Sequence, residues 1–126
     1  KTKTVDKAAI LAGMAIANEM VERDRAIAAE QAAAELPERV RHFANIIGVS
    51  VGRITIRSQR TRWGSCSAKR NLNFNCLLML TPDHVVDYVV VHELCHIRHH
   101  NHSAAFWAEV TRVMPDYKQR QALLRD

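Results

Sequence analysis

Hydrophobic positions in the first part of the chain repeat with the spacing of a helix. From Asp6 to about Glu35 the sequence is rich in Ala, Glu, Gln and Arg, which favour helix formation. Pro37 suits the first turn of a second helix, and Gly48 is a common residue just past a helix end. The pattern therefore predicts two helices that separate near Pro37. Their apolar faces carry Ile10, Met14, Ala17 and Val21 in the first helix and Val40, Phe43, Ala44 and Ile47 in the second.

After Gly48 the hydrophobic period changes from that of a helix to that of a strand. Residues 51–56 form a short apolar run, and residues 71–76 alternate cleanly between polar and apolar side chains. Residues 62–67 can pair with the second of these strands in a hairpin that turns near residues 68–70. We therefore expect a small sheet. In the expected register, one buried face carries Trp63, Ser65, Phe74 and Cys76.

The last third of the chain returns to helical spacing. Thr81-Pro82-Asp83 is typical of a helix start with Thr81 as the N-cap, and Asn101 can close this helix. Ser103 can cap a following helix that Pro115 ends, before a last short helix. Helices, a small sheet and further helices together predict an α+β fold. The first of these C-terminal helices is mostly buried through Val85, Val86, Val89, Val90, Leu94 and Ile97.

Composition and length favour one compact domain. The chain has 126 residues, of which 48% are apolar, with few Gly and Pro residues, so disorder and fibrous repeats are excluded. We expect one domain over residues 1–126, with an N-terminal helix in 1–35 and the core in 36–126. No apolar run approaches the roughly 20 residues that span a membrane.

The net charge of +5 is unevenly distributed. Between Glu38 and Asp83 the chain has eight Lys or Arg residues and no acidic residue, and the remaining ten basic and thirteen acidic residues leave −3. The positive charge therefore belongs to the second helix and the hairpin. It predicts a preference for partners that carry carboxylates or phosphates.

The cysteines favour a reducing compartment. Cys66, Cys76 and Cys95 have the spacing of neither a metal knuckle nor a secreted disulfide framework, so we expect free thiols and a cytoplasmic location. A basic segment over residues 1–7, an apolar segment over 8–17 and small residues at Ala15 and Ala17 resemble a signal peptide. Asp6 and the Ala-rich composition favour a helix instead.

The strongest chemical signal is His92-Glu93-Leu94-Cys95-His96, within the mostly buried helix. Residues four apart on a helix lie about 6 Å apart along its axis on one face, so both imidazoles can reach one ion. Zn²⁺ binds neutral imidazoles at about 2.0–2.1 Å. Glu93 is placed to accept a proton from a zinc-bound water. Packing alone is a poor explanation, because unpartnered His and Glu side chains would cost several kcal/mol in such a helix.

A third ligand must come from beyond the motif. His99 and His100 lie too far along the axis if the helix continues. His102 follows His96 by six residues, as in H-E-x-x-H-x-x-G-x-x-H sites, although His99 stands where those sites have Gly. Glu109 is the rival, since other zinc hydrolases take a downstream Glu. We favour His102, with water in the fourth position.

Other polar residues allow more than one interpretation. Arg62 could bind an oxyanion or a substrate carboxylate, and Tyr88 and Tyr117 could polarise a substrate oxygen or simply pack. Asp87 or Asp116 could accept a hydrogen bond from the second ring nitrogen of a ligand histidine. The basic residues in and around the hairpin form either a solvated surface or a phosphate-binding one: Arg57, Arg60, Arg62, Lys69 and Arg70.

Several segments, taken together and in this order, resemble those of a known family: residues 36–39 (LPER), 60–66 (RTRWGSC), 87–96 (DYVVVHELCH), 101–103 (NHS) with Phe106 and Trp107, and 114–117 (MPDY). From about Leu36 to Arg125 the chain therefore resembles the YgjP-like family of zincin-type metallopeptidases, related to the SprT-like and WLM groups. The resemblance implies that His92, His96 and His102 bind zinc and that Glu93 is the catalytic base, in a zincin core with an active-site helix beneath a small sheet. Family members carry further β-structure ahead of the Leu36 region, where this chain has an Ala-rich helix.

Three functions are compatible with these residues. The first is a zinc-dependent metallohydrolase that cleaves an amide in an extended peptide or protein segment laid along the hairpin edge. The second uses the same site to hydrolyse a nucleotide phosphoanhydride, with the hairpin arginines on the phosphates. The third is a non-catalytic, zinc-stabilised module that binds nucleic acid. No membrane partner is expected.

Overall fold

The computed structural model describes residues 22–58 and 62–124. It has the expected α+β fold. Residues 6–21 of the helix that was predicted from Asp6 to about Glu35, and the signal-peptide alternative, lie outside the described residues. The elements in chain order are α2 (Glu22–Ile47), β1 (Ile54–Arg57), β2 (Gly64–Cys66), β3 (Leu72–Asn75), the 3-10 helix η1 (Cys76–Leu80), α3 (Asp83–Arg98), α4 (Ala104–Val113) and α5 (Tyr117–Ala122).

Helix α2 continues through Pro37, so the prediction of a helix break there is wrong. Proline in a helix interior removes one hydrogen-bond donor and usually bends or ends the helix. Here Leu36 and Val40, on either side of Pro37, are both buried, and the apolar stripe continues across it without a shift. Packing of this stripe therefore outweighs the local preference of proline. The stripe consists of Ala28, Ala32, Leu36, Val40, Ala44 and Ile47.

The sheet has the order β1-β3-β2, with β3 in the centre. Strand β2 is antiparallel to β3, and the predicted hairpin turn is confirmed by hydrogen bonds from Ser67 N–H to Asn71 and from Arg70 N–H to Ser67. Strand β1 runs parallel to β3. The sheet is therefore mixed, and its edge strand β2 is formed by residues that precede the hairpin turn.

The expected register of this hairpin is wrong by one residue. Gly64 lies opposite Phe74, and Ser65 lies opposite Asn73, whose amide donates to the Ser65 hydroxyl at 3.3 Å. Ser65 therefore lies on the opposite face of the sheet from Phe74, so the single buried face expected for Trp63, Ser65, Phe74 and Cys76 does not form. Cys76 begins η1 and does not extend the strand. The close approach of Phe74 to Gly64 explains this register, because a Cβ at Gly64 would lie 3.3 Å from the Phe74 ring.

The ends of the helices follow the sequence in part. Gly48, with φ +84°, ends α2, and the Ser103 hydroxyl accepts from Phe106 N–H at 3.3 Å to cap α4, as predicted. Thr81 does not cap α3. Its hydroxyl donates to the Leu78 carbonyl at 2.8 Å and ends η1 instead, which leaves Pro82 at the start of α3.

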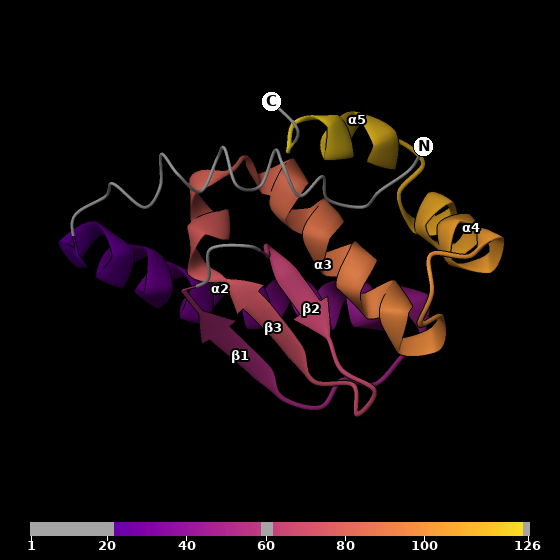
Figure 1. The fold of residues 1–126 in the computed structure, drawn as a ribbon, viewed down its shortest axis with the longest axis horizontal. Coiled ribbons are helices and arrows are strands. Elements are labelled where there is room, and N and C mark those ends of the chain that lie inside the picture. The colour runs from indigo at the N-terminus through magenta and orange to yellow at the C-terminus, as the bar shows by residue number, and fades with distance from the viewer. Residues whose placement is uncertain (1–21, 59–61, 125–126) are drawn as a thin grey trace.

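Helix α3 lies between the sheet and the C-terminal helices. It packs against α2, β2, α4 and α5, while α2 also packs against β1 and η1. In Figure 1, α2 passes behind the sheet, and β2 is the strand on the side of α3. The edge strand and the helix that carries the histidine motif are therefore neighbours. Within the described part of the chain, no helix has both the length and the apolar character needed to cross a membrane.

Candidate metal centre

Three histidine side chains converge on one point beside α3. The Nε2 atoms of His92 and His96 are 3.0 Å apart, and His102 Nε2 lies 3.1 Å from His96 Nε2 and 3.4 Å from His92 Nε2. A tetrahedral zinc ion with bonds of about 2.0–2.1 Å separates its nitrogen ligands by about 3.3–3.4 Å. The three nitrogens therefore have the spacing of a shared metal ion, and together they form a group that could hold one.

The chain brings His102 back to the motif by leaving the helix early. Helix α3 ends at Arg98, three residues before the expected end at Asn101, and His99 is extended with φ −129° and ψ 100°. The next helix starts after Ser103. This short connection turns the chain, so His102 joins the group although His99 stands where related motifs have Gly.

Loss of hydration favours the neutral form of the three imidazoles, of which His92 is buried, His96 is half-buried and His102 is exposed. This loss lowers the pKa of His92 well below its ordinary value, and the neighbouring His96 and His102 add to this effect. Burial also lowers the pKa of His96 and of His102. Because Zn²⁺ binds the neutral form of imidazole, each of these lowered pKa values favours metal binding.

The second ring nitrogen of His96 is held by the backbone. His96 Nδ1 lies 3.0 Å from the His99 carbonyl, which can only accept, so Nδ1 carries the proton and Nε2 offers its lone pair to the group. The aspartates expected in this role bind arginines instead: Asp87 accepts from Arg39 at 2.6 Å and Asp116 from Arg120 at 3.0 Å. In His92, Nδ1 is buried without a hydrogen-bond partner among the described residues.

Aromatic side chains surround the histidines. The ring of Phe106 lies 4.9, 4.5 and 5.1 Å, centre to centre, from the rings of His92, His96 and His102. Trp107 stacks on His102 at 5.8 Å. This apolar wall accounts for the lowered pKa values, because it keeps water from solvating charged imidazoles.

The two candidate tyrosines extend the aromatic wall. Tyr88 is fully buried, 6.0 Å from the His92 ring, and Tyr117 stacks on Trp107 at 5.1 Å and on Tyr88 at 6.4 Å. Burial of Tyr88 favours the packing interpretation. A role for either hydroxyl on a substrate stays a prediction.

Glu93 lies in the contact between α3 and β2. Only 5% of it is exposed, and a Cβ at Gly64 would come within 3.2 Å of Glu93 Cγ. Burial raises the pKa of Glu93 to about 8, while the positive charge of the exposed Arg62 acts in the opposite direction. Burial and the charge of Glu93 raise the pKa of the Cys66 thiol to about 11, so this cysteine is a packing residue.

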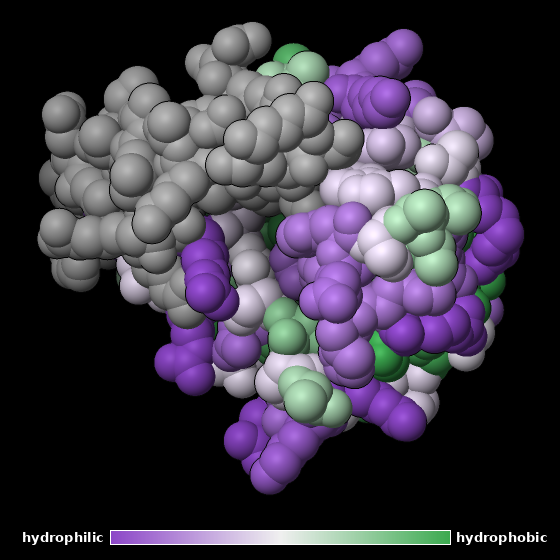
Figure 2. Space-filling model, turned by 45° about the vertical axis from the view of Figure 1, so that its right-hand side comes forward, coloured by the Kyte–Doolittle hydropathy of each residue, from purple (hydrophilic) through white to green (hydrophobic). Residues whose placement is uncertain are grey.

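Two other basic residues in and around the hairpin bind polar neighbours outside the histidine group. Arg57 donates to Asn73 at 2.9 Å, and Arg70 donates to Ser50 at 2.8 Å. Arg60 lies outside the described residues. Figure 2, which brings the right-hand side of Figure 1 forward, shows a mostly hydrophilic surface in which apolar residues form small patches.

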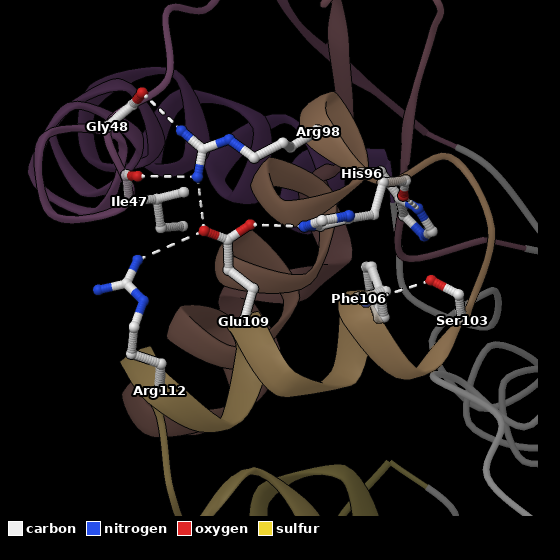
Figure 3. A network of polar contacts seen from close by, with 9 residues as sticks. Ile47, Gly48, His96, Arg98, Ser103, Phe106, Glu109 and Arg112 are labelled. Atoms are coloured by element: carbon white, nitrogen blue, oxygen red, sulfur yellow. Dashed lines mark hydrogen bonds and ion pairs between the residues drawn. The ribbon is translucent and has the colours of Figure 1, made fainter.

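Glu109, the rival third ligand, is not part of the histidine group. Its carboxylate accepts from Arg98 at 2.6 Å and from His99 at 3.1 Å (Figure 3). The sequence did not lead us to predict that Glu109 accepts hydrogen bonds between α4 and the end of α3. A signal does exist, because Glu109 stands three residues after Phe106 and one before Val110, on the face of α4 that packs inward. An acid at such a position requires a partner.

Comparison with known proteins identifies the family and the fold. A family model, YgjP-like, metallopeptidase domain, matches residues 14–126, which includes α2 and extends ahead of the resemblance that begins at Leu36. Among curated protein sequences, none matches this chain.

Two solved structures share the fold. The metallopeptidase zymogen of Pyrococcus abyssi abylysin is 22% identical, with a TM-score of 0.64 over 70% of this chain and 90% of the other. The metallopeptidase zymogen of Methanocaldococcus jannaschii jannalysin is 17% identical, with a TM-score of 0.63 over 71% of this chain and 93% of the other.

Proposed function

Since the chain belongs to the YgjP-like metallopeptidase domain family, we propose that it is a zinc-dependent peptidase whose zinc ligands are His92, His96 and His102. The observation that supports this assignment most directly is the convergence of the three Nε2 atoms within 3.4 Å. Three neutral nitrogen donors suit zinc, whereas Mg²⁺ and Ca²⁺ prefer oxygen ligands. Water is proposed for the fourth position.

Glu93 is the proposed general base. A zinc ion at the histidines would supply Lewis acidity toward a water molecule and the scissile carbonyl. The Glu93 carboxylate accepts a proton from the attacking water and then donates it to the leaving amine. Burial raises the pKa of Glu93 to about 8 in the metal-free protein, and a zinc cation bound by the adjacent His92 would favour the ionised carboxylate that a general base requires.

Arg62 is the proposed contact for negative charge on the substrate. Arg62 is exposed, and its positive charge lowers the pKa of Glu93. A negatively charged substrate group near the scissile bond would therefore also be attracted by Arg62. The guanidinium can stabilise an oxyanion or bind an acidic side chain. This proposal gives the concentrated positive charge of the hairpin one specific role.

The proposed substrate is an extended peptide segment along β2. In the order β1-β3-β2, the outer side of β2 has no neighbouring strand among the described residues. An extended peptide could add to this edge through backbone hydrogen bonds, next to α3. The metallopeptidase family supports a peptide or protein as the substrate, and the comparisons give no support to a nucleotide or nucleic acid. The three free thiols suit the cytoplasmic location that we also propose.

The test is the Glu93→Gln variant. We expect it to retain the metal content of the wild type and to lose peptide hydrolysis, measured by mass spectrometry on a mixed library of extended peptides. Glu38→Gln is the matched control, because the Glu38 side chain is 76% exposed on α2 and far from the motif in sequence. Wild-type turnover in Glu93→Gln would contradict the proposed mechanism. Release of phosphate from nucleotides without peptide cleavage would contradict the proposed substrate.

A further inference from the structure

Glu109 joins the end of α3 to α4 through one carboxylate, and Arg98 extends this connection to the end of α2. Its side chain is 9% exposed, and it accepts from Arg98 Nη1 at 2.6 Å, from His99 Nε2 at 3.1 Å and from Arg112 Nη2 at 3.4 Å (Figure 3). We propose that Glu109 is a positioning residue of the metal centre, which holds the connection between α3 and α4 so that His96 and His102 keep their ligand geometry. This inference rests on the proposed function.

The first step of the argument runs from Glu109 through His99 to His96. The His99 ring donates to Glu109, while the His99 carbonyl accepts from His96 Nδ1 at 3.0 Å. The His99 N–H donates to the Cys95 carbonyl at 3.0 Å. His99 is therefore fixed by its side chain and by both backbone groups. The acceptor that orients His96 and sets its tautomer depends on this arrangement.

The second step concerns Arg98, the last residue of α3. Its guanidinium donates to Glu109 and also to the carbonyls of Ile47 at 3.3 Å and Gly48 at 2.9 Å. Carbonyls at a helix C-terminus lack partners within the helix, so Arg98 satisfies two acceptors where α2 ends. Through Arg98 and Glu109, the end of α3 is tied to both α2 and α4.

The third step concerns His102. The segment of residues 99–103 leaves α3 at Arg98 and enters α4 after Ser103. Glu109 holds the start of this segment from the side of α4. Because His102 lies within the segment, a change in the distance between α3 and α4 would move its ring away from His92 and His96.

Glu109 is not proposed as a metal ligand, and it acts through residues that position the ligands. Both of its oxygens bind cationic or N–H donors, and the three imidazoles already supply the nitrogen ligands. Loss of the carboxylate leaves Arg98 and His99 without their common acceptor. Changes to groups that orient metal ligands typically weaken metal binding by about 10- to 100-fold.

The test compares Glu109→Ala and Glu109→Gln with Arg112→Ala as the matched control. Arg112 binds the same carboxylate, but through a longer contact and from a side chain that is 54% exposed. We expect zinc affinity, measured by competition with a chelator, to fall about 10- to 100-fold in Glu109→Ala. Glu109→Gln should lose less zinc affinity than Glu109→Ala, because its amide oxygen can still accept a hydrogen bond from one of the two donors, Arg98 or His99. Arg112→Ala should change the affinity by less than about fivefold.

A spectroscopic measurement separates positioning from simple stabilisation. With Co²⁺ in place of zinc, the visible spectrum of Glu109→Ala should shift, while that of Arg112→Ala should match the wild type. Unchanged affinity and spectrum in Glu109→Ala, with only lower thermal stability, would overturn the inference. If Glu109→Ala does not fold, the same measurements are made on Glu109→Gln. Wild-type zinc affinity and a wild-type Co²⁺ spectrum in Glu109→Gln would then overturn the inference. A wild type that binds no metal, or binds it independently of His102, would instead refute the proposed function.

Discussion

The buried carboxyl of Glu93 predicts an unusual pH dependence of stability in the metal-free protein. Burial raises its pKa from 4.5 to about 8. The folded state therefore retains a proton that the unfolded state releases, so the contribution of Glu93 to stability is greatest below pH 4.5 and is lost as the pH rises from 4.5 through 8. At about 1.4 kcal/mol per pH unit, this difference in proton binding at Glu93 destabilises the folded state by roughly 4 kcal/mol at about pH 8 and by roughly 1 kcal/mol at about pH 5.

The Glu93→Gln substitution removes this cost while it preserves the shape of the side chain. In excess chelator, we expect the variant to exceed the wild type in free energy of unfolding by roughly 3–4 kcal/mol more at about pH 8 than at about pH 5. Urea unfolding followed by circular dichroism measures the difference. The histidines also titrate, but they are common to both proteins and cancel in the comparison. Glu38→Gln, at an exposed position, should show no such pH dependence.

Zinc should weaken this trend, because a cation bound by the adjacent His92 would favour the ionised Glu93 carboxylate. The advantage of Glu93→Gln at high pH should therefore shrink when zinc replaces the chelator. Parallel stability curves for the wild type and Glu93→Gln, without chelator-dependent divergence, would refute the assignment of Glu93 as a buried, ionisable group next to a metal site.

Three further predictions concern the surroundings of the site. Arg62→Ala should raise the pKa of Glu93, because it removes a charge that lowers it, and should shift the acid limb of kcat/KM to higher pH. Arg62→Lys should not shift it, and an unmoved limb in Arg62→Ala would separate Arg62 from Glu93. Gly64→Ala should lower the free energy of unfolding by about 1–3 kcal/mol in urea titrations, since its Cβ would lie 3.2 Å from Glu93 Cγ and from the Asn73 carbonyl; wild-type stability would contradict this packing. Phe106→Ala should cost about 3–5 kcal/mol and weaken zinc binding, because its ring contacts all three histidines. Loss of stability with unchanged zinc affinity would mean that Phe106 does not orient them.

The histidine group and the helix that carries it could be predicted from the sequence, because the relevant relations are local. The four-residue spacing of His92 and His96 fixes their common face on any helix. Ser103 and Gly48 act as helix caps through side-chain and backbone properties that hardly depend on the rest of the fold. The α+β class follows from the change in hydrophobic period.

The features that the sequence did not predict depend on contacts between distant residues. Pro37 remains inside α2 because Leu36 and Val40 are buried against other elements, which no local pattern shows. The parallel pairing of β1 with β3 joins segments separated by the hairpin strand. The hairpin register differs by one residue because the space beside Gly64 is filled by Phe74 and by Glu93 of α3.

The position of Glu109 has the same origin. Its identity as an acid is visible in the sequence, but whether it binds a metal or an arginine depends on how α4 meets α3. In the structure its partners outside α4 are the last residue of α3 and the first residue beyond it. The early end of α3 at Arg98 decides this choice, since it places His102 with the other histidines and His99 with Glu109.

The central claim is that His92, His96 and His102 together hold a catalytic zinc ion. Elemental analysis of the purified protein, with and without the His102→Ala substitution, tests it most directly, and circular dichroism confirms that both proteins are folded. The account predicts one zinc ion per chain in the wild type and in Glu93→Gln, and loss of zinc in His102→Ala. A folded wild type without zinc, or full zinc content in His102→Ala, would contradict it.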